Sequence, residues 1–159
     1  IELGVTQAAI DVCDNPNPKT VYEAKFSLQH CVSIAILYGQ IGFDSFDSEA
    51  RQQASGLAKK FSLKCNEEFE KDYPDAWGAE VKVKLTNGKE LSVRRKNAKG
   101  DPEARLSPKE MLEKAEMLFR YGGVPNAEVW YERILGLSRE QSFGDSDLIH
   151  LLDVSSTIS

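Results

Sequence analysis

The sequence predicts an α+β fold in two layers, a mostly antiparallel sheet with a β-hairpin and with helices packed on it. Short alternating apolar runs, typical of strands, occur at 1–5, at 61–65 and on both sides of a turn at 86–88. Segments with helical spacing begin at two capping signals, Thr20 and Ser107. The resulting order is strand, helix, helix, strand, hairpin, helix, helix, which favours the α+β class.

Length and composition are those of one soluble globular domain. The chain has 159 residues, enough to bury a sizeable core, and its 41% of hydrophobic residues is ordinary for such a protein. The net charge of −5 argues against nucleic acid or an anionic membrane as the main partner. No segment reaches the ~18 consecutive apolar residues of a membrane span.

The three cysteines, Cys13, Cys31 and Cys65, are widely spaced and form no CxxC pair. An odd number without a pairing pattern fits neither a disulfide framework nor a zinc site. We therefore expect reduced thiols and a cytoplasmic protein, or a mitochondrial one if the source is eukaryotic. Cys31 lies in an apolar run and is expected to be a small core residue.

The first residue, Ile1, already lies inside the first predicted strand, and no initiator Met precedes it. We therefore expect a fragment, either an excised domain or a processed chain. A short helical or irregular piece follows at 7–13. Two X-Pro steps then predict a turn or extended linker at 14–18.

A capped helix is predicted from Thr20 to about Tyr38. Thr20 and Glu23 form a capping box in which the hydroxyl accepts from a free backbone N–H and the carboxylate reaches back. Gly39 supplies the stop. Because residues 32–38 are apolar nearly all round, we expect the helix to be buried on most sides.

After a loop at 40–46, a second helix is expected at 47–60 with Asp47 as its cap. Its outer face is expected to carry three basic residues, Arg51, Lys59 and Lys60. The strand at 61–65 leads into an acidic connection at 67–78 that has room for a helical turn.

The register of the hairpin follows from its apolar pattern. A two-residue turn at Asn87 and Gly88 would put the apolar residues of the two strands on opposite faces of the hairpin. A three-residue loop at 86–88 instead pairs Val83 with Leu91. We therefore predict a type I turn with a G1 bulge, in which Gly88 is left-handed.

The C-terminal third is predicted to be helical. Ser107, Pro108 and Glu110 give a second capping box, with Pro at the first helical position, and the glycines at 122–123 end that helix. Further helices are expected at 126–135 and at 145–152. The tail at 153–159 is expected to be frayed.

Four polar residues, Lys25, Ser27, Gln29 and His30, stand early in the first long predicted helix. A helix N-terminus favours an anion, a lysine adds a full charge, and a histidine can exchange a proton near neutral pH. Such a cluster would suit a carboxylate substrate in acid–base chemistry. The alternative is structural: His30 would be a satisfied core histidine, and Lys25 would pair with an acidic group or extend to water.

For the other candidate functional residues, a packing role is favoured. The second histidine, His150, lies in a leucine-rich segment, and Trp77 and Trp130 are expected to be core or rim anchors. No Ser–His–Asp spacing, phosphate-binding glycine loop or metal-ligand cluster is present in the sequence.

Several motifs, in order along the chain, resemble one family. The stretches 13–20 and 23–29 resemble the start of the C-terminal domain of the MmgE/PrpD family. The hairpin at 79–89 and the segments 99–103 and 106–107 resemble later parts of the same domain. The family contains 2-methylcitrate dehydratase, cis-aconitate decarboxylase and iminodisuccinate epimerase. The resemblance covers nearly the whole chain and thins toward its end.

This resemblance implies that residues 1–159 are a single α+β domain, the small C-terminal domain of a longer two-domain enzyme. That enzyme would be a lyase or an isomerase. Members move a proton next to a carboxylate of a small di- or tricarboxylate, use no metal or organic cofactor, and commonly form homodimers. A large helical domain, absent from this chain, and a segment upstream of Ile1 supply most of the acid–base residues. The resemblance thus implies a small carboxylate substrate and a missing N-terminal helical domain as partners.

The Glu-Ala-Lys-Phe-Ser motif of the family carries over onto 23–27. We therefore expect Lys25, Ser27 and Gln29 to bind substrate and His30 to be catalytic, with no metal ligand. The position of His30 is often aromatic in relatives, so a tyrosine role cannot be transferred to it. The alternative function is a non-catalytic remnant, or a dimerisation or interaction module, which the absence of the upstream acid–base residues motivates. An exposed apolar patch beside this helix would mark the surface of the missing partner.

Overall fold

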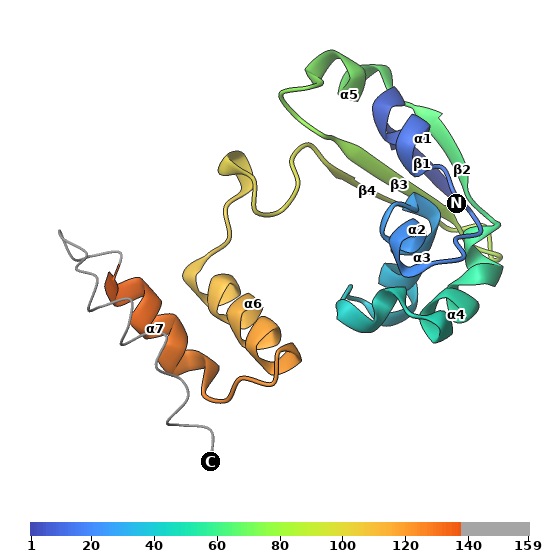
Figure 1. The fold of residues 1–159 in the computed structure, drawn as a ribbon. Coiled ribbons are helices and arrows are strands. Elements are labelled where there is room, and N and C mark those ends of the chain that lie inside the picture. The colour runs from blue at the N-terminus through green and yellow to red at the C-terminus, as the bar shows by residue number, and fades with distance from the viewer. Residues whose placement is uncertain (138–159) are drawn as a thin grey trace. The chain divides into compact units, whose positions relative to one another are not determined.

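The computed structural model describes residues 1–137. Its contacts divide the chain into two compact units, Ile1–Arg105 and Leu106–Ser159. The described residues form seven α-helices and four strands, which confirms the α+β class (Figure 1). Whether residues 1–159 make one domain of a longer enzyme stays a prediction.

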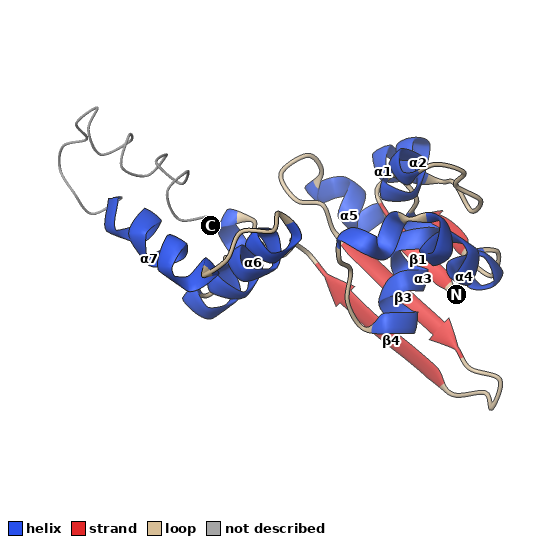
Figure 2. Ribbon diagram, turned by 60° about the horizontal axis from the view of Figure 1, so that its bottom comes forward, coloured by secondary structure: helices blue, strands red, loops and turns tan. Residues whose placement is uncertain are grey.

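The first unit is built on one mixed sheet. Its strands are β1 (Glu2–Val5), β2 (Ser62–Cys65), β3 (Ala79–Lys84) and β4 (Glu90–Arg95). They lie in the order β2-β1-β3-β4; β1 and β2 are parallel, and the other two pairs are antiparallel. Helices of this unit lie across the sheet, as Figure 2 shows. The mostly antiparallel sheet with helices packed on it is therefore confirmed.

The strand register separates an apolar face from a charged face. Leu3 lies opposite both Leu63 and Val81, so the apolar side chains of three strands share one side of the sheet. On the other side, Lys64 Nζ lies 2.5 Å from a carboxylate oxygen of Glu2. This hydrogen bond lowers the pKa of Glu2 below its usual value. The buried apolar residues, which make up the core, come mainly from β1 and the helices: Leu3, Val5, Ala24, Ile34, Ala54, Ala58, Phe69 and Ala76.

The hairpin has the predicted register. Val83 pairs with Leu91 and Val81 with Val93. The N–H of Gly88 donates to the carbonyl of Leu85 at 2.9 Å, and Gly88 has a φ of 84°. A three-residue loop with a left-handed glycine is the G1-bulge arrangement expected from the apolar pattern.

The prediction of a single helix from Thr20 to Tyr38 is wrong in one respect, because the segment forms two helices. Helix α2 covers Val21–Lys25, and α3 covers Leu28–Tyr38. Between them Ser27 takes an extended conformation, with φ −120° and ψ 107°. The hydroxyl of a serine can hydrogen-bond to backbone groups and so offer the chain an alternative to helical hydrogen bonding. At Ser27 the chain adopts this alternative and leaves the helix.

The ends of this region agree with the sequence except at one hydrogen bond. Thr20 caps α2 by accepting from the N–H of Glu23 at 3.1 Å, and Gly39 ends α3 in the left-handed region. The Glu23 carboxylate, however, accepts from the N–H of Lys19 at 2.7 Å and not from that of Thr20. The carboxylate therefore reaches one residue further back than a capping box requires.

Helix α3 is less buried than its composition predicts. Its buried residues, Gln29, His30, Ser33 and Ile34, lie on one face in its first two turns. The last turn is open: Ile36, Leu37 and Tyr38 are 47%, 48% and 52% exposed. The expectation of a helix buried on most sides is thus wrong for the described chain, because only one face packs against the first unit.

The remaining helices of this unit are short. Helix α1 spans Gln7–Cys13, and α4 spans Ser48–Ala58 with Asp47 as its cap, as predicted. A 3₁₀ turn, η1 (Phe43–Phe46), lies within the predicted loop. Helix α5 covers Glu67–Asp72 and supplies the helical turn expected in the acidic connection. A second 3₁₀ turn, η2, covers Pro102–Ala104.

The described part of the second unit is a helix pair. Helix α6 (Pro108–Tyr121) begins at the predicted capping box of Ser107 and Glu110, and α7 covers Ala127–Leu137. Gly122 caps the end of α6, as expected. The helix predicted at 145–152, His150 and the tail at 153–159 lie outside the described residues. Within the described chain, no helix combines the length and the apolar character needed to cross a membrane.

Two glycine substitutions test this backbone. Gly88→Ala should lower the free energy of unfolding by about 1 kcal/mol, because a side chain disfavours the left-handed region. Gly56→Ala is the control: this exposed position inside α4 has open space around an added Cβ, so stability should rise by up to about 1 kcal/mol. Urea unfolding followed by circular dichroism measures both; equal effects would contradict the predicted turn geometry.

Candidate functional site

Ser27 occupies the break between α2 and α3. Its side chain is 1% exposed and makes two hydrogen bonds within the chain. The hydroxyl donates to the carbonyl of Asn15 at 2.5 Å and accepts from the N–H of His30 at 3.0 Å. The same oxygen therefore caps α3 and fastens the linker that follows α1.

Gln29 holds the same linker from the first turn of α3. Its side-chain carbonyl accepts from the N–H of Asn15 at 3.2 Å, and its amide donates to Asp14 Oδ1 at 2.5 Å. The residue is 2% exposed, and both ends of its amide are engaged. Ser27 and Gln29 together fix residues 14 and 15, so their polar atoms serve the chain itself in this structure.

His30 fastens a different segment. Its Nε2 lies 2.7 Å from the carbonyl oxygen of Ser45, in η1, and its ring lies 5.9 Å from that of Phe46, centroid to centroid. A carbonyl oxygen only accepts, so Nε2 must carry a proton. At 1% exposure, His30 is the buried histidine of the structural alternative, and the catalytic role predicted for it stays a prediction.

Lys25 is the exposed member of the predicted cluster. It stands in the last turn of α2, not in the first turns of one long helix. Its Nζ lies 5.9 Å from the centroid of the Phe46 ring, within the range of a cation–π contact. No ion pair joins it to a carboxylate within the described chain, so its charge is available to a ligand.

Arg51 was not predicted from the sequence to be a site residue, and it does not lie on the outer face of α4 as expected. It is half-buried, and its Nη1 donates to the carbonyl of Phe46 at 2.6 Å. The turn η1 thus receives three basic side chains, from His30, Arg51 and Lys25. The hint in the sequence was the position of Arg51, one turn into a helix that starts just after the loop. The contact itself depends on the path of that loop, which the sequence does not show.

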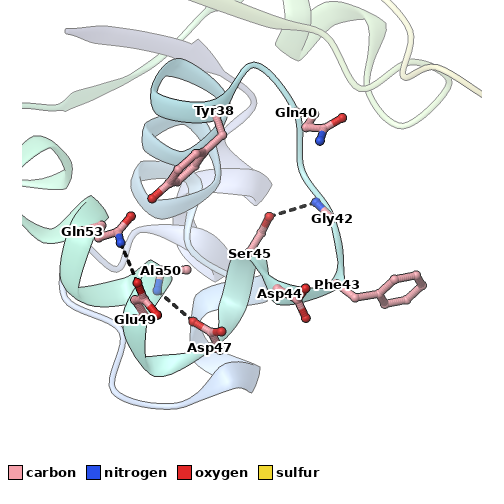
Figure 3. A pocket seen from close by; sticks show the side chains of 10 residues that line it. All are labelled: Tyr38, Gln40, Gly42, Phe43, Asp44, Ser45, Asp47, Glu49, Ala50 and Gln53. Atoms are coloured by element: carbon pink, nitrogen blue, oxygen red, sulfur yellow. Dashed lines mark hydrogen bonds between the residues drawn. The ribbon is translucent and has the colours of Figure 1, made fainter. Parts of the chain in front are cut away.

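The loop that contains η1 also borders a cavity of about 360 Å³ (Figure 3). Three carboxylates are among its lining residues, those of Asp44, Asp47 and Glu49, and no lysine or arginine is. In Figure 3 the Asp47 carboxylate bonds the N–H of Ala50, and the Gln53 amide bonds Glu49. Such a lining repels anions, so a carboxylate substrate does not belong in this cavity.

The cysteines are not set up as nucleophiles. Burial raises the pKa of the Cys31 thiol, with a further contribution from Cys13, and burial also raises the pKa of Cys13. Both thiols therefore stay protonated at neutral pH, while a nucleophile or metal ligand is a thiolate. Within residues 1–137, no three His, Cys, Asp or Glu side chains meet in a way that could hold a metal ion.

Fold and site together define a class: an α+β domain that presents a lysine beside a loop fixed by buried polar contacts. The chain matches the MmgE/PrpD C-terminal domain over residues 1–130. It therefore belongs to the MmgE/PrpD family, and the resemblance carried by its motifs is confirmed. A search of curated proteins found no match.

Removing the Ser27 hydroxyl should destabilise the first unit. Ser27→Ala loses the cap of α3 and leaves the partly buried carbonyl of Asn15 without this donor, so we expect about 2 kcal/mol less free energy of unfolding. The control is Ser55→Ala, which removes a hydroxyl that makes an exposed hydrogen bond to the Gln52 carbonyl within α4; the expected change is within about 0.5 kcal/mol. Urea unfolding compares the two variants, and equal losses would show that Ser27 does not tie the linker to α3.

Proposed function

We propose that this chain is the small domain of a cofactor-independent lyase or isomerase that acts on small di- or tricarboxylates. The observation that carries the proposal is the family match over residues 1–130, a range that includes an exposed lysine with no carboxylate partner among residues 1–137. This lysine is Lys25, and we assign it the contact with the substrate. Ser27, Gln29 and His30, which bond to the chain itself, would support this surface from within.

In a dehydratase or an epimerase, the chemistry begins with removal of a proton from a carbon next to a carboxylate. Negative charge then spreads onto that carboxylate, and a nearby cation stabilises it more in the transition state than in the ground state. A dehydratase then releases the neighbouring hydroxyl with a proton, as water. An epimerase returns a proton to the opposite face of the carbon, and a decarboxylase releases CO₂ and protonates the carbon that carried it.

In this proposal Lys25 supplies binding and charge, while the base comes from the family's helical domain. A lysine ammonium is a compact charge on a flexible stem, suited to one carboxylate oxygen at a time. The Nε2–H of His30 already donates to Ser45, so His30 could act as an acid or base only after leaving that carbonyl. Its direct participation would therefore need a rearrangement of η1.

The open apolar surface on α3 and the loop after it supports the proposed partners. Its members are 40–52% exposed: Ile36, Leu37, Tyr38, Ile41 and Phe43. Exposed apolar residues gathered on one helix end and its loop mark an interaction surface. The proposed covering partners are the helical domain and a second copy of the protein.

The same surface favours a second candidate, an interaction module without activity. The two candidate functions differ in one respect: whether the complete protein binds and converts carboxylates. The complete protein is this chain together with its helical domain. The 159-residue chain alone should show no turnover of citrate-like substrates under either candidate; turnover by it would overturn the division of labour with the helical domain.

Lys25→Ala in the complete protein tests the proposal. Loss of a charge-assisted contact should weaken citrate binding by about 10-fold or more. The matched control is Lys71→Ala, because Lys71 also stands exposed in the last turn of a short helix, α5; we expect it to leave affinity unchanged. Isothermal titration gives the affinity and a steady-state assay the turnover. Equal behaviour of the two variants would show that Lys25 is not a substrate ligand.

A further inference from the structure

Phe46, at the end of η1, has a basic side chain on each of two sides. Lys25 Nζ lies 5.9 Å from the centroid of its ring, and Arg51 Nη1 donates to its carbonyl at 2.6 Å. The two cations come from different helices, α2 and α4. Only the fold brings them to one residue.

Arg51 has donors left for a ligand. A guanidinium carries five N–H donors in a planar fork, and the described contact with Phe46 uses the Nη1 group alone. No ion pair joins Arg51 to a carboxylate within the described residues. The half-buried side chain is also held in place by that carbonyl, so binding an anion would cost less ordering than at a free surface arginine.

The neighbouring carboxylates line the cavity beside the loop. Asp44, Asp47 and Glu49 line that cavity, and Phe46 and Arg51 are not among its lining residues. The Asp47 carboxylate is further engaged as the cap of α4. The acidic lining of that cavity therefore includes neither Arg51 nor Lys25.

We infer that Arg51 is a second substrate-binding residue, which takes one carboxylate of the substrate while Lys25 takes another. This inference rests on the proposed function and names the feature that would select dicarboxylates over monocarboxylates. Arginine suits the role because its fork matches the two oxygens of a carboxylate. With one cation on each side of Phe46, a ligand with two carboxylates gains a contact that a monocarboxylate lacks.

The test compares two probes of nearly the same shape, succinate and its monoamide succinamate, on the complete protein. The wild type should bind succinate more tightly by about 10-fold or more, since one more charge-assisted contact forms. Arg51→Gln should remove this preference and change succinamate affinity by less than about threefold. The control, Arg95→Gln, removes another arginine that donates to a backbone carbonyl, that of Arg94, and should keep the preference.

Each result decides one question. If Arg51→Gln prefers succinate to the same degree as the wild type, the role of Arg51 is overturned. The proposed function would then depend on Lys25 alone. Equal losses for both probes would assign Arg51 to loop structure only. Arg51→Lys is the second variant if the glutamine variant does not fold; it keeps the charge without the fork and should show an intermediate preference. A wild type that binds neither succinate nor citrate would overturn the proposed function itself.

Discussion

The hydroxyl of Ser27 is the constraint on which this site depends. One buried oxygen caps α3 and holds the carbonyl of Asn15, so the chain must leave the helix at Phe26 and start a new one. This break ends α2 at Lys25 and leaves the lysine exposed. It also places Gln29 and His30 in the first turn of α3, from which their side chains reach the linker and η1. The polar residues of one short motif thus divide into one that faces solvent and three that fasten loops.

Burial makes these contacts hard to lose. A polar group taken out of water and left without its partner costs about 1–3 kcal/mol, more than the net gain of an average hydrogen bond. Ser27, Gln29 and His30 are almost fully buried, and each bonds to a segment outside α3. Their loss would release the linker or η1 and, with η1, the Phe46 carbonyl that Arg51 binds. The placement of Lys25 and Arg51 is therefore a property of this buried network.

Much of the fold follows from local signals in the sequence. The apolar alternation and Gly88 determined the hairpin register, and the caps at Thr20, Asp47 and Ser107 each start a helix as expected. The break at Ser27 could not be predicted in the same way, because no Pro or Gly marks it and its hydroxyl bonds a residue 12 positions earlier. The role of Arg51 was hidden for a related reason: helical spacing shows the face of α4, but not the loop that folds back against it. Composition also overstated the burial of α3, since it shows that a surface is apolar but not what covers it.

In the proposed function, this member of the MmgE/PrpD family presents cations to a small carboxylate, while a helical domain completes the chemistry. The most direct measurement is a crystal structure of the complete protein with citrate bound. We expect a citrate carboxylate within hydrogen-bond distance of Lys25 Nζ, with Ser27, Gln29 and His30 keeping their internal contacts. Citrate bound away from Lys25, with the lysine in solvent, would contradict this role of the domain.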